Sequence, residues 1–178
     1  TGTQRIEEEL QEILTKRGTT PKIQRMDADT TLQKGSHRRI LQEFSSGAID
    51  ILVGTQMVAK GLDFSRVTLV GVVNADLQLF MPDFRAAERT FQLLTQVSGR
   101  AGRSSEYAGE VIIQTAHPDH QAIIATLAGR YELLYNDELQ LRKDAHYPPF
   151  TRFVMIEFSG LYEQQVHEHS HYFAGFLP

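Results

Sequence analysis

The sequence predicts an α/β domain in which a parallel sheet is flanked by helices. Short apolar stretches alternate with longer segments of helical periodicity, which is the pattern of crossover βαβ units. The stretch 67–73 is nearly continuous in apolar character, so we expect a strand that is covered on both faces. The 178 residues and 41% hydrophobic content are enough for one packed domain with a small appendage.

Helices are expected where apolar residues recur at helical spacing, and strands where short apolar runs occur. Gly18 is expected to stop the first helix and Gly47 the second. The expected strands of the main domain cover 22–26, 49–53, 67–73 and 111–115. The expected helices cover 3–17, 36–45, 84–98 and most of 119–142.

A domain boundary is predicted where Tyr147-Pro148-Pro149-Phe150 interrupts this alternation. Residues 1–146 then form the main domain, and 147–178 form the start of a truncated small α+β C-terminal domain. This tail is expected to hold a strand, 152–158, followed by a helix, 162–177. Because one strand and one helix cannot bury a core alone, we expect the tail to dock on the main domain or to belong to a larger unit.

Composition narrows the class of protein. No run of about 18 apolar residues is present, which excludes a transmembrane helix. Cysteine is absent, so disulfides and thiolate metal sites are excluded within this chain, and a cytosolic location is expected. The net charge of −4 means that any contact with DNA is local or shared with other parts of a larger protein. We interpret the chain, which begins at Thr1 without a secretion leader, as a fragment.

The first segment with potential chemistry is 54–64, directly after the strand expected at 49–53. In open parallel sheets ligands bind just beyond the carboxyl ends of the strands. The glycines of this segment would let backbone amides approach a phosphate closely. The hydroxyl of Thr55 can donate to a phosphate oxygen, and the carboxylate of Asp63 can accept from a ribose hydroxyl or hold a neighbouring arginine.

The second segment, 96–103, ends the helix expected at 84–98 and contains Arg100 and Arg103. A guanidinium is a rigid fork of donors that suits phosphate oxygens. Two such groups can neutralise the charge that develops on a transferring γ-phosphoryl group, which is the arginine-finger role. Each segment alone is more often a turn or a solvated helix end, but the two in this order match a specific pattern.

These segments resemble motifs V and VI of superfamily 2 helicases, since 96–103 reads Gln-Val-Ser-Gly-Arg-Ala-Gly-Arg. Further stretches resemble the family of the bacterial primosomal protein N-prime, and with them the similarity covers essentially the whole chain. These stretches are 25–31, 54–61, 82–89, 114–115, 118–120 and 147–150.

The resemblance implies the second RecA-like lobe of an ATP-dependent 3′→5′ DNA helicase that acts in replication restart in the bacterial cytoplasm. The implied partners are single-stranded and forked DNA, other primosome proteins and single-stranded-DNA-binding protein. No association with a membrane is implied. In this scheme the arginines face the γ-phosphate and Gln96 relays the nucleotide state. The implied roles are catalysis for Arg100, Arg103 and Gln96, nucleotide contact for Gly61 and Asp63, and DNA-backbone contact for Thr55, Gln56 and Lys60.

The resemblance also implies what lies elsewhere in such a protein. A phosphate loop and the acidic box that holds magnesium are absent from the sequence, so ATP and Mg²⁺ are expected to be shared with a first lobe. The family's Zn²⁺-binding insertion is rich in cysteine and would precede Thr1. No metal site is expected in this chain, and the isolated chain is expected to be inactive.

Other polar and aromatic residues have two interpretations each. Asp27 and Asp29 look like a catalytic pair, although a turn rich in Asx residues is favoured. Asp76 either couples the end of the strand at 67–73 to the expected ligand-binding cleft or stabilises a turn. Phe84 is favoured as a core residue over a base-stacking one, whereas Phe80 is left open.

Two further sets of polar side chains are interpreted most simply as parts of helix surfaces. Arg85, Glu88 and Arg89 most simply form ion pairs on a helix surface, although the resemblance leaves a DNA-side role open. His167 and His171 share a helix face, for which a polar surface is favoured over a metal site.

Two alternative functions remain. Another superfamily 2 translocase, such as a branch-migration enzyme or an RNA helicase, would share both motifs. A non-catalytic scaffold with a degenerate helicase lobe is the alternative from a different class, and the intact Arg100 and Arg103 argue against it.

Overall fold

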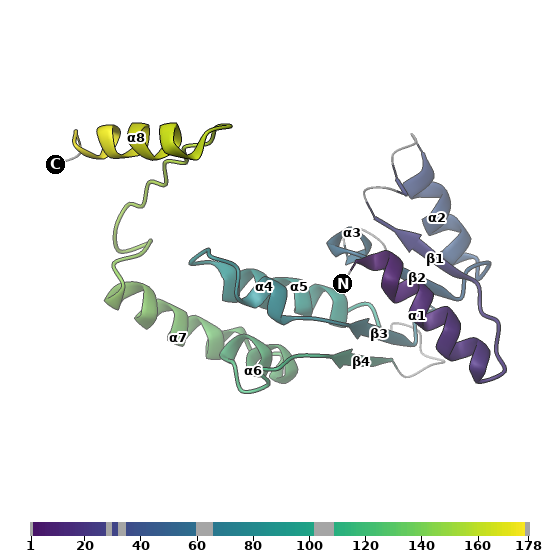
Figure 1. Ribbon diagram of the computed structural model, residues 1–178. Helices are drawn as coiled ribbons and strands as arrows, with labels where there is room; N and C mark the ends of the chain where they lie inside the picture. The colour runs from purple at the N-terminus through teal and green to yellow at the C-terminus, as the bar shows by residue number, and fades with distance from the viewer. Residues whose placement is uncertain (1, 28–29, 32–34, 60–65, 102–108, 177–178) are drawn as a thin grey trace. The chain divides into compact units, whose positions relative to one another are not determined.

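The computed structural model describes residues 2–27, 30–31, 35–59, 66–101 and 109–176. The elements of the main part alternate between helices and parallel strands, as Figure 1 shows. The strands are β1 Ile23–Met26, β2 Ile51–Gly54, β3 Leu69–Val72 and β4 Glu110–Ile113. The helices are α1 Thr3–Lys16, α2 Ser36–Ser45, α3 Gln56–Ala59, α4 Asp76–Leu79, α5 Ala86–Ser98, α6 Gln121–Ala128, α7 Tyr131–Asp144 and α8 Glu163–Ala174.

The predicted α/β class with parallel strands is confirmed, and the strands form two pairs. β1 pairs with β2 so that Met26 faces Gly54, and β3 pairs with β4 so that Val72 faces Ile113. Within the described residues no hydrogen-bonded ladder joins the two pairs. Since each pair is parallel, the carboxyl ends of its two strands meet at one edge.

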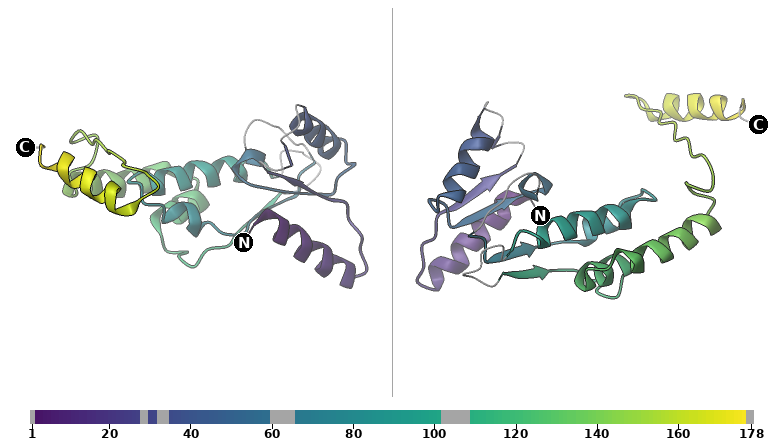
Figure 2. Two further views of the ribbon diagram at one scale, coloured as in Figure 1. Left: turned by 45° about the horizontal axis from the view of Figure 1, so that its top comes forward. Right: turned by 180° about the vertical axis from the view of Figure 1, so that it is seen from behind.

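The β1–β2 pair has α1 and α2 on its opposite sides (Figures 1 and 2). The core lies on the α2 side, where Met26 is fully buried among Ile40, Leu41 and Ile49. Within α2, the apolar residues Ile40, Leu41 and Phe44 recur at helical spacing, and for this reason the helix was predicted with its observed bounds. The α1 side is less covered, and α1 has no fully buried residue.

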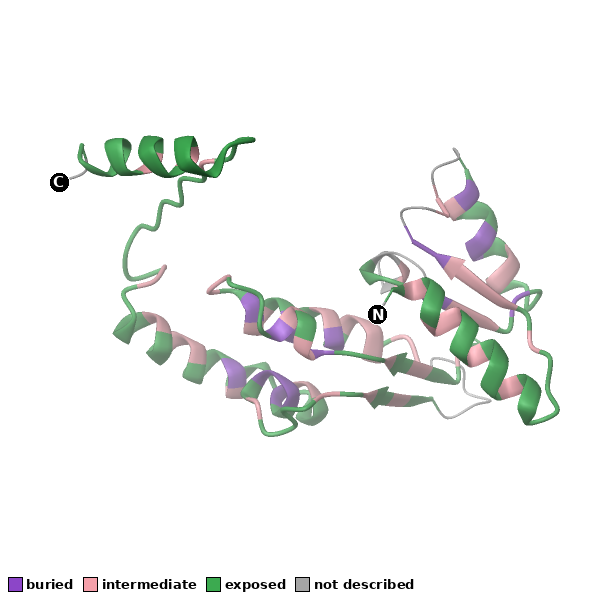
Figure 3. Cartoon of the chain, viewed as in Figure 1, coloured by how far each residue is buried: buried purple, intermediate pink, exposed green. Residues whose placement is uncertain are grey.

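The β3–β4 pair packs against α5 and α6 through Leu94 and Ile123, which are both almost fully buried. The expectation that 67–73 is covered on both faces is wrong. Leu69 is 56% exposed and Val73 is 47% exposed, and exposure alternates along the strand as on a half-buried sheet. Figure 3 shows this alternation of exposed and intermediate residues along β3 and β4.

The long helical segment expected at 119–142 is divided into α6 and α7. The break occurs at Gly129, whose φ of +62° is left-handed backbone that glycine adopts without a Cβ clash. Two further short helices, α3 and α4, were not predicted from the sequence. Each has only four residues, which is too few to establish a helical period.

Contacts within the chain separate it into two compact units, Thr1–Glu138 and Leu139–Pro178, so the division falls within α7. The boundary between 146 and 147 stays a prediction. The strand expected at 152–158 is wrong, because these residues form no ladder with any described strand. Val154 and Met155 are 79% and 75% exposed, and a strand without a partner leaves its backbone groups unpaired. The helix of the tail is present as α8.

Replacing Gly54 with Ala should destabilise the first unit. A Cβ at Gly54 would lie 2.6 Å from the carbonyl oxygen of Met26 and would also overlap Cγ2 of Val58. We expect the free energy of unfolding to fall by about 1–3 kcal/mol, the usual cost of overpacking. Gly71→Ala is the matched control in β3, since a Cβ there meets nothing within 4 Å. Urea denaturation measures both, and equal losses would contradict the close approach at Gly54.

Candidate functional site

The carboxyl edges of the two strand pairs carry the polar residues that the sequence singled out. Asp27 follows β1 and Thr55 follows β2, and their neighbours Met26 and Gly54 are register partners. Because parallel strands end at the same edge, the loop after β1 begins beside the segment after β2. This is the location at which open α/β sheets bind ligands.

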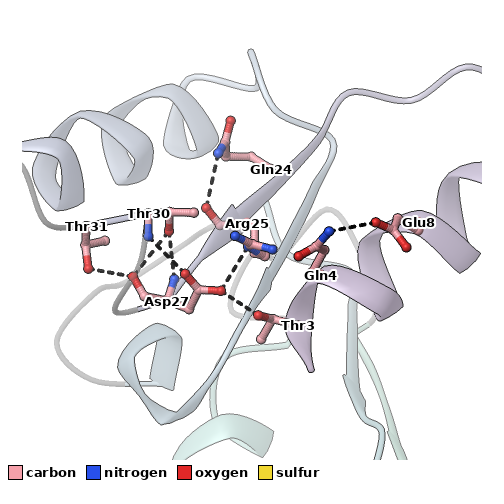
Figure 4. A network of polar contacts seen from close by, with 8 residues as sticks. All are labelled: Thr3, Gln4, Glu8, Gln24, Arg25, Asp27, Thr30 and Thr31. Carbon is pink, nitrogen blue, oxygen red and sulfur yellow. Dashed lines mark hydrogen bonds and ion pairs between the residues drawn. The ribbon is translucent and has the colours of Figure 1, made fainter. Parts of the chain in front are cut away.

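Asp27 is the centre of a polar network at this edge, shown in Figure 4. Its carboxylate accepts from the backbone N–H of Thr30 at 3.0 Å and from the hydroxyl of Thr3, and it pairs with Nε of Arg25 at 2.9 Å. Its carbonyl oxygen accepts from the hydroxyl of Thr31 at 2.6 Å. Asp27 is 7% exposed, so these bonds satisfy a buried charge.

The network decides between the two interpretations of Asp27. The hydroxyl of Thr3, followed by the backbone N–H of Thr30, holds the pKa of Asp27 below its usual range. A carboxylate that is ionised and occupied by donors stabilises the turn and the contact with α1, and it is poorly suited to proton transfer. The turn interpretation is confirmed for Asp27, whereas Asp29 lies outside the described residues.

The segment after β2 is anchored by α3. Val58 packs against the Met26 core, and its backbone N–H donates to the carbonyl oxygen of Thr55 at 3.1 Å. The side chain of Gln56 is exposed and donates from Nε2 to Oε1 of Gln78 in α4 at 2.9 Å. Gln56 therefore follows the β1–β2 pair in the chain, while its side chain is held by Gln78 of α4, which follows β3. Thr55 is exposed beside it. Lys60, Gly61 and Asp63 lie outside the described residues.

The second segment begins at the end of α5. Gln96 is half-buried in its last turn, and the backbone N–H of Arg100 donates to the carbonyl oxygen of Val97 at 3.0 Å. The Nε atom of Arg100 is buried, while the residue as a whole is partly exposed. Arg103 lies outside the described residues.

Contacts between α3 and α5 bring the first segment beside the helix that carries Gln96. The two segments are separated in sequence by β3 and α4 but belong to one compact unit. The first segment carries the exposed hydroxyl of Thr55 and the exposed amide of Gln56, and the second segment contains the guanidinium of Arg100. Such a set can donate hydrogen bonds to phosphate oxygens.

Asp76 stabilises the carboxyl edge of the β3–β4 pair, as Asp27 stabilises that of the β1–β2 pair. Its carboxylate accepts from the hydroxyl of Thr115 at 2.5 Å and from the backbone N–H of Ala116 at 2.8 Å. The hydroxyl bond is the main reason that the pKa of Asp76 lies below its usual range. Asn74, which lies two residues before α4, accepts from the N–H groups of Asp76 and Leu77 in the first turn of that helix. These bonds support the turn-stabilising interpretation of Asp76.

No role was predicted from the sequence for Asn74, Gln78 or Thr115. A signal was present only for Asn74, which precedes a short helix as capping residues do. Gln78 and Thr115 act through partners far away in the sequence, which no local pattern reveals.

Arg85 and Arg89 form surface ion pairs, as expected, but both pair with Asp83, which was not predicted as their partner. Nε of Arg85 lies 3.2 Å from Asp83, and a guanidinium nitrogen of Arg89 lies 2.7 Å from the same carboxylate. The hydrogen bond from Arg85 is the main reason that the pKa of Asp83 is lowered. The guanidinium of Arg85 also lies 5.2 Å from the centre of the Phe84 ring. Phe84 is half-buried, and Phe80 is 57% exposed.

Within the described residues, no group of three or more His, Cys, Asp or Glu side chains can hold a metal ion. The rings of His167 and His171 lie 4.5 Å apart on α8. No helix within the described ranges is both long enough and apolar enough to cross a membrane.

Residues 1–105 match the helicase conserved C-terminal domain, and the chain belongs to this family. The match includes both segments, and the α/β fold with parallel strands confirms the RecA-like class that the resemblance implied.

The chain is similar to proteins named replication restart protein PriA. It is 53% identical to that of Bacillus subtilis (strain 168) over 89% of this chain, and 45% identical to that of Chlamydia pneumoniae over 96% of this chain. A third such relative, from a Synechocystis species, is 49% identical over 80% of this chain. The matched region is 19%, 22% and 17% of these three relatives, so the chain spans about a fifth of their length. The resemblance to a replication-restart helicase family is confirmed.

Replacing Asp27 with Asn should weaken the acid dependence of stability. A carboxyl whose folded pKa is lowered stabilises the fold above its unfolded pKa, and this contribution is lost as the pH falls through the folded pKa. The free energy of unfolding of the wild type should therefore fall more steeply below about pH 4 than that of Asp27→Asn.

Urea denaturation between neutral pH and about pH 3 measures the two slopes. Asp137→Asn, at an exposed position on α7, controls for the loss of one negative charge. Parallel curves for the wild type and Asp27→Asn would contradict the assignment of Asp27 as an ionised structural carboxylate.

Proposed function

We propose that this chain is the second motor lobe of an ATP-dependent 3′→5′ DNA helicase that acts in replication restart. The observation that carries the proposal is the match to the helicase C-terminal domain over 1–105, which includes both segments that α3 and α5 bring together. The similarity to replication restart proteins over most of the chain supports this role over that of another superfamily 2 translocase.

The proposed role of the second segment is to stabilise the transferring phosphoryl group. Arg100 and Arg103 supply guanidinium groups to the γ-phosphate of ATP, and Gln96 relays the nucleotide state from the last turn of α5. The chemistry of this donor set fits an anionic ligand, since it carries positive charge and no carboxylate. Gly61 and Asp63 are proposed to contact the sugar of the nucleotide.

Mg²⁺ is proposed to bind with ATP on a first lobe of the full-length protein. Within the described part of this chain no cluster of acidic side chains fits a metal, so no step is assigned to Mg²⁺ here. Zn²⁺ binding elsewhere in the full-length protein is part of the same proposal, since this chain has no cysteine.

The first segment is proposed to contact DNA. Thr55 and Gln56 are exposed and can donate to backbone phosphates of single-stranded or forked DNA. Lys60 is proposed as an additional phosphate contact. Other primosome proteins and single-stranded-DNA-binding protein are proposed partners, and the bacterial cytoplasm is the proposed location.

Arg100→Ala and Arg103→Ala should each lower ATP turnover in the full-length protein by about 10³-fold. ATP affinity should change little, because a first lobe would hold most of the nucleotide. Lys at position 103 should not restore turnover, because an ammonium lacks the planar fork of donors. Steady-state ATP hydrolysis at saturating DNA measures the effect.

Arg130→Ala is the matched control, since Arg130 is an exposed arginine that follows α6. Circular dichroism checks that each variant is folded. Folded Arg100→Ala and Arg103→Ala proteins with wild-type turnover would refute the motor role and favour a non-catalytic scaffold.

The isolated chain should hydrolyse ATP at no more than a background rate, with or without DNA. Phosphoryl transfer needs a phosphate cradle and a residue that holds magnesium in addition to the arginines. The isolated chain should also bind single-stranded DNA weakly, and this binding should decrease steeply with salt. DNA-stimulated hydrolysis by the purified chain would refute its assignment as a second lobe.

A further inference from the structure

An exposed apolar group lies beyond β3, at the end of α4. Leu77 is 68% exposed, Phe80 is 57% exposed and Met81 is 53% exposed, although Leu79 between them is 5% exposed. The buried residue anchors the helix, and its neighbours project into solvent. An exposed cluster of large apolar side chains is typical of a binding surface.

The ring of Phe80 is held in place by the loop that follows β4. Its centroid lies 4.6 Å from that of His117 in an edge-on arrangement and 6.5 Å from that of His120. The bonds from Thr115 and Ala116 to Asp76 fix α4 to the same loop. A ring that is already ordered loses little conformational entropy when a ligand stacks on it.

Helix α4 is joined to the segment proposed to touch DNA. The side chain of Gln78 in α4 accepts a hydrogen bond from Gln56 at 2.9 Å, and Gln78 lies two residues before Phe80, on a different face of the helix. A strand of nucleic acid that contacts Gln56 would therefore lie beside α4.

The chemistry of the surface favours a base over a phosphate. The imidazole of His120 accepts from the backbone N–H of Ala122 through Nδ1, which leaves Nε2 as the donor of the neutral ring. The carboxylate of Asp76 is occupied by two donors, whereas Asp119 is exposed nearby and disfavours a phosphate at this position. Stacking on an aromatic ring needs no positive charge, so it suits a chain with a net charge of −4.

We propose that Phe80, held against His117, stacks on a base of single-stranded DNA next to the backbone contact at Gln56. The inference rests on the proposed function, since it assumes that DNA passes over the first segment. It assigns to Phe80 a sequence-tolerant contribution to DNA affinity that depends weakly on salt.

The test measures binding of a fluorescent single-stranded oligonucleotide to the full-length protein by anisotropy, with DNA-stimulated ATP hydrolysis measured in parallel. Phe80→Ala should weaken binding by about 5- to 150-fold, the range that corresponds to loss of one stacked base. Phe80→Trp should retain affinity, whereas Phe80→Leu should lose it despite a similar apolar volume. Tyr172→Ala, at a 73% exposed aromatic of α8, is the matched control.

An oligonucleotide with abasic sites separates stacking from a structural effect. Phe80→Ala should weaken binding of the intact strand and leave binding of the abasic strand unchanged, and the fold-loss should persist at high salt. Equal weakening on both strands, or wild-type affinity of Phe80→Ala, would overturn the stacking role. Absence of DNA-stimulated hydrolysis in the wild type would instead refute the proposed function, on which the inference rests.

Discussion

The close approach of β1 and β2 at Gly54 is the constraint on which the candidate site depends. In this register Met26 faces Gly54, and the missing Cβ leaves room for Val58 to pack against the same core. The chain must then turn immediately into α3, which places Gln56 where Gln78 can accept from it. A side chain at Gly54 would separate Met26 from Val58 and displace the segment proposed to touch DNA.

The carboxylates at the carboxyl edges of both strand pairs stabilise the fold. The groups left to contact a ligand are therefore the other polar and aromatic side chains at these edges. Asp27 and Asp76 at the strand edges, and Asp83 just before α5, all have lowered pKa values, and each accepts from hydroxyl, amide or guanidinium donors nearby. The charges of Asp27 and Asp83 are balanced locally by the arginines with which they pair, whereas Asp76 is bonded to a hydroxyl and a backbone N–H. The exposed groups beside them are the hydroxyl of Thr55, the amide of Gln56 and aromatic rings, which suit a phosphate backbone and bases.

Features that depend on local sequence could be predicted, and features that depend on distant partners could not. The helix 36–45 and the parallel strands follow from apolar periodicity within short windows. The strand expected at 152–158 has suitable residues, but a strand also needs a partner, and its sequence contains no information about one. The prediction that 67–73 is covered on both faces was wrong for the same reason. The number of helices that cover a face of a sheet is a property of the whole domain.

The same distinction applies within the candidate site. Recognition of phosphate by glycines, hydroxyls and guanidinium groups uses residues close together in the chain, so both segments could be found from their order and spacing. The bond from Thr115 to Asp76 joins residues 39 apart, and it is one of the contacts that hold α4 beside His117. Without that loop Phe80 would be one more exposed aromatic residue. The surface proposed to stack on a base is thus built by tertiary contacts, whereas the residues proposed to contact phosphate lie within two short segments of the sequence.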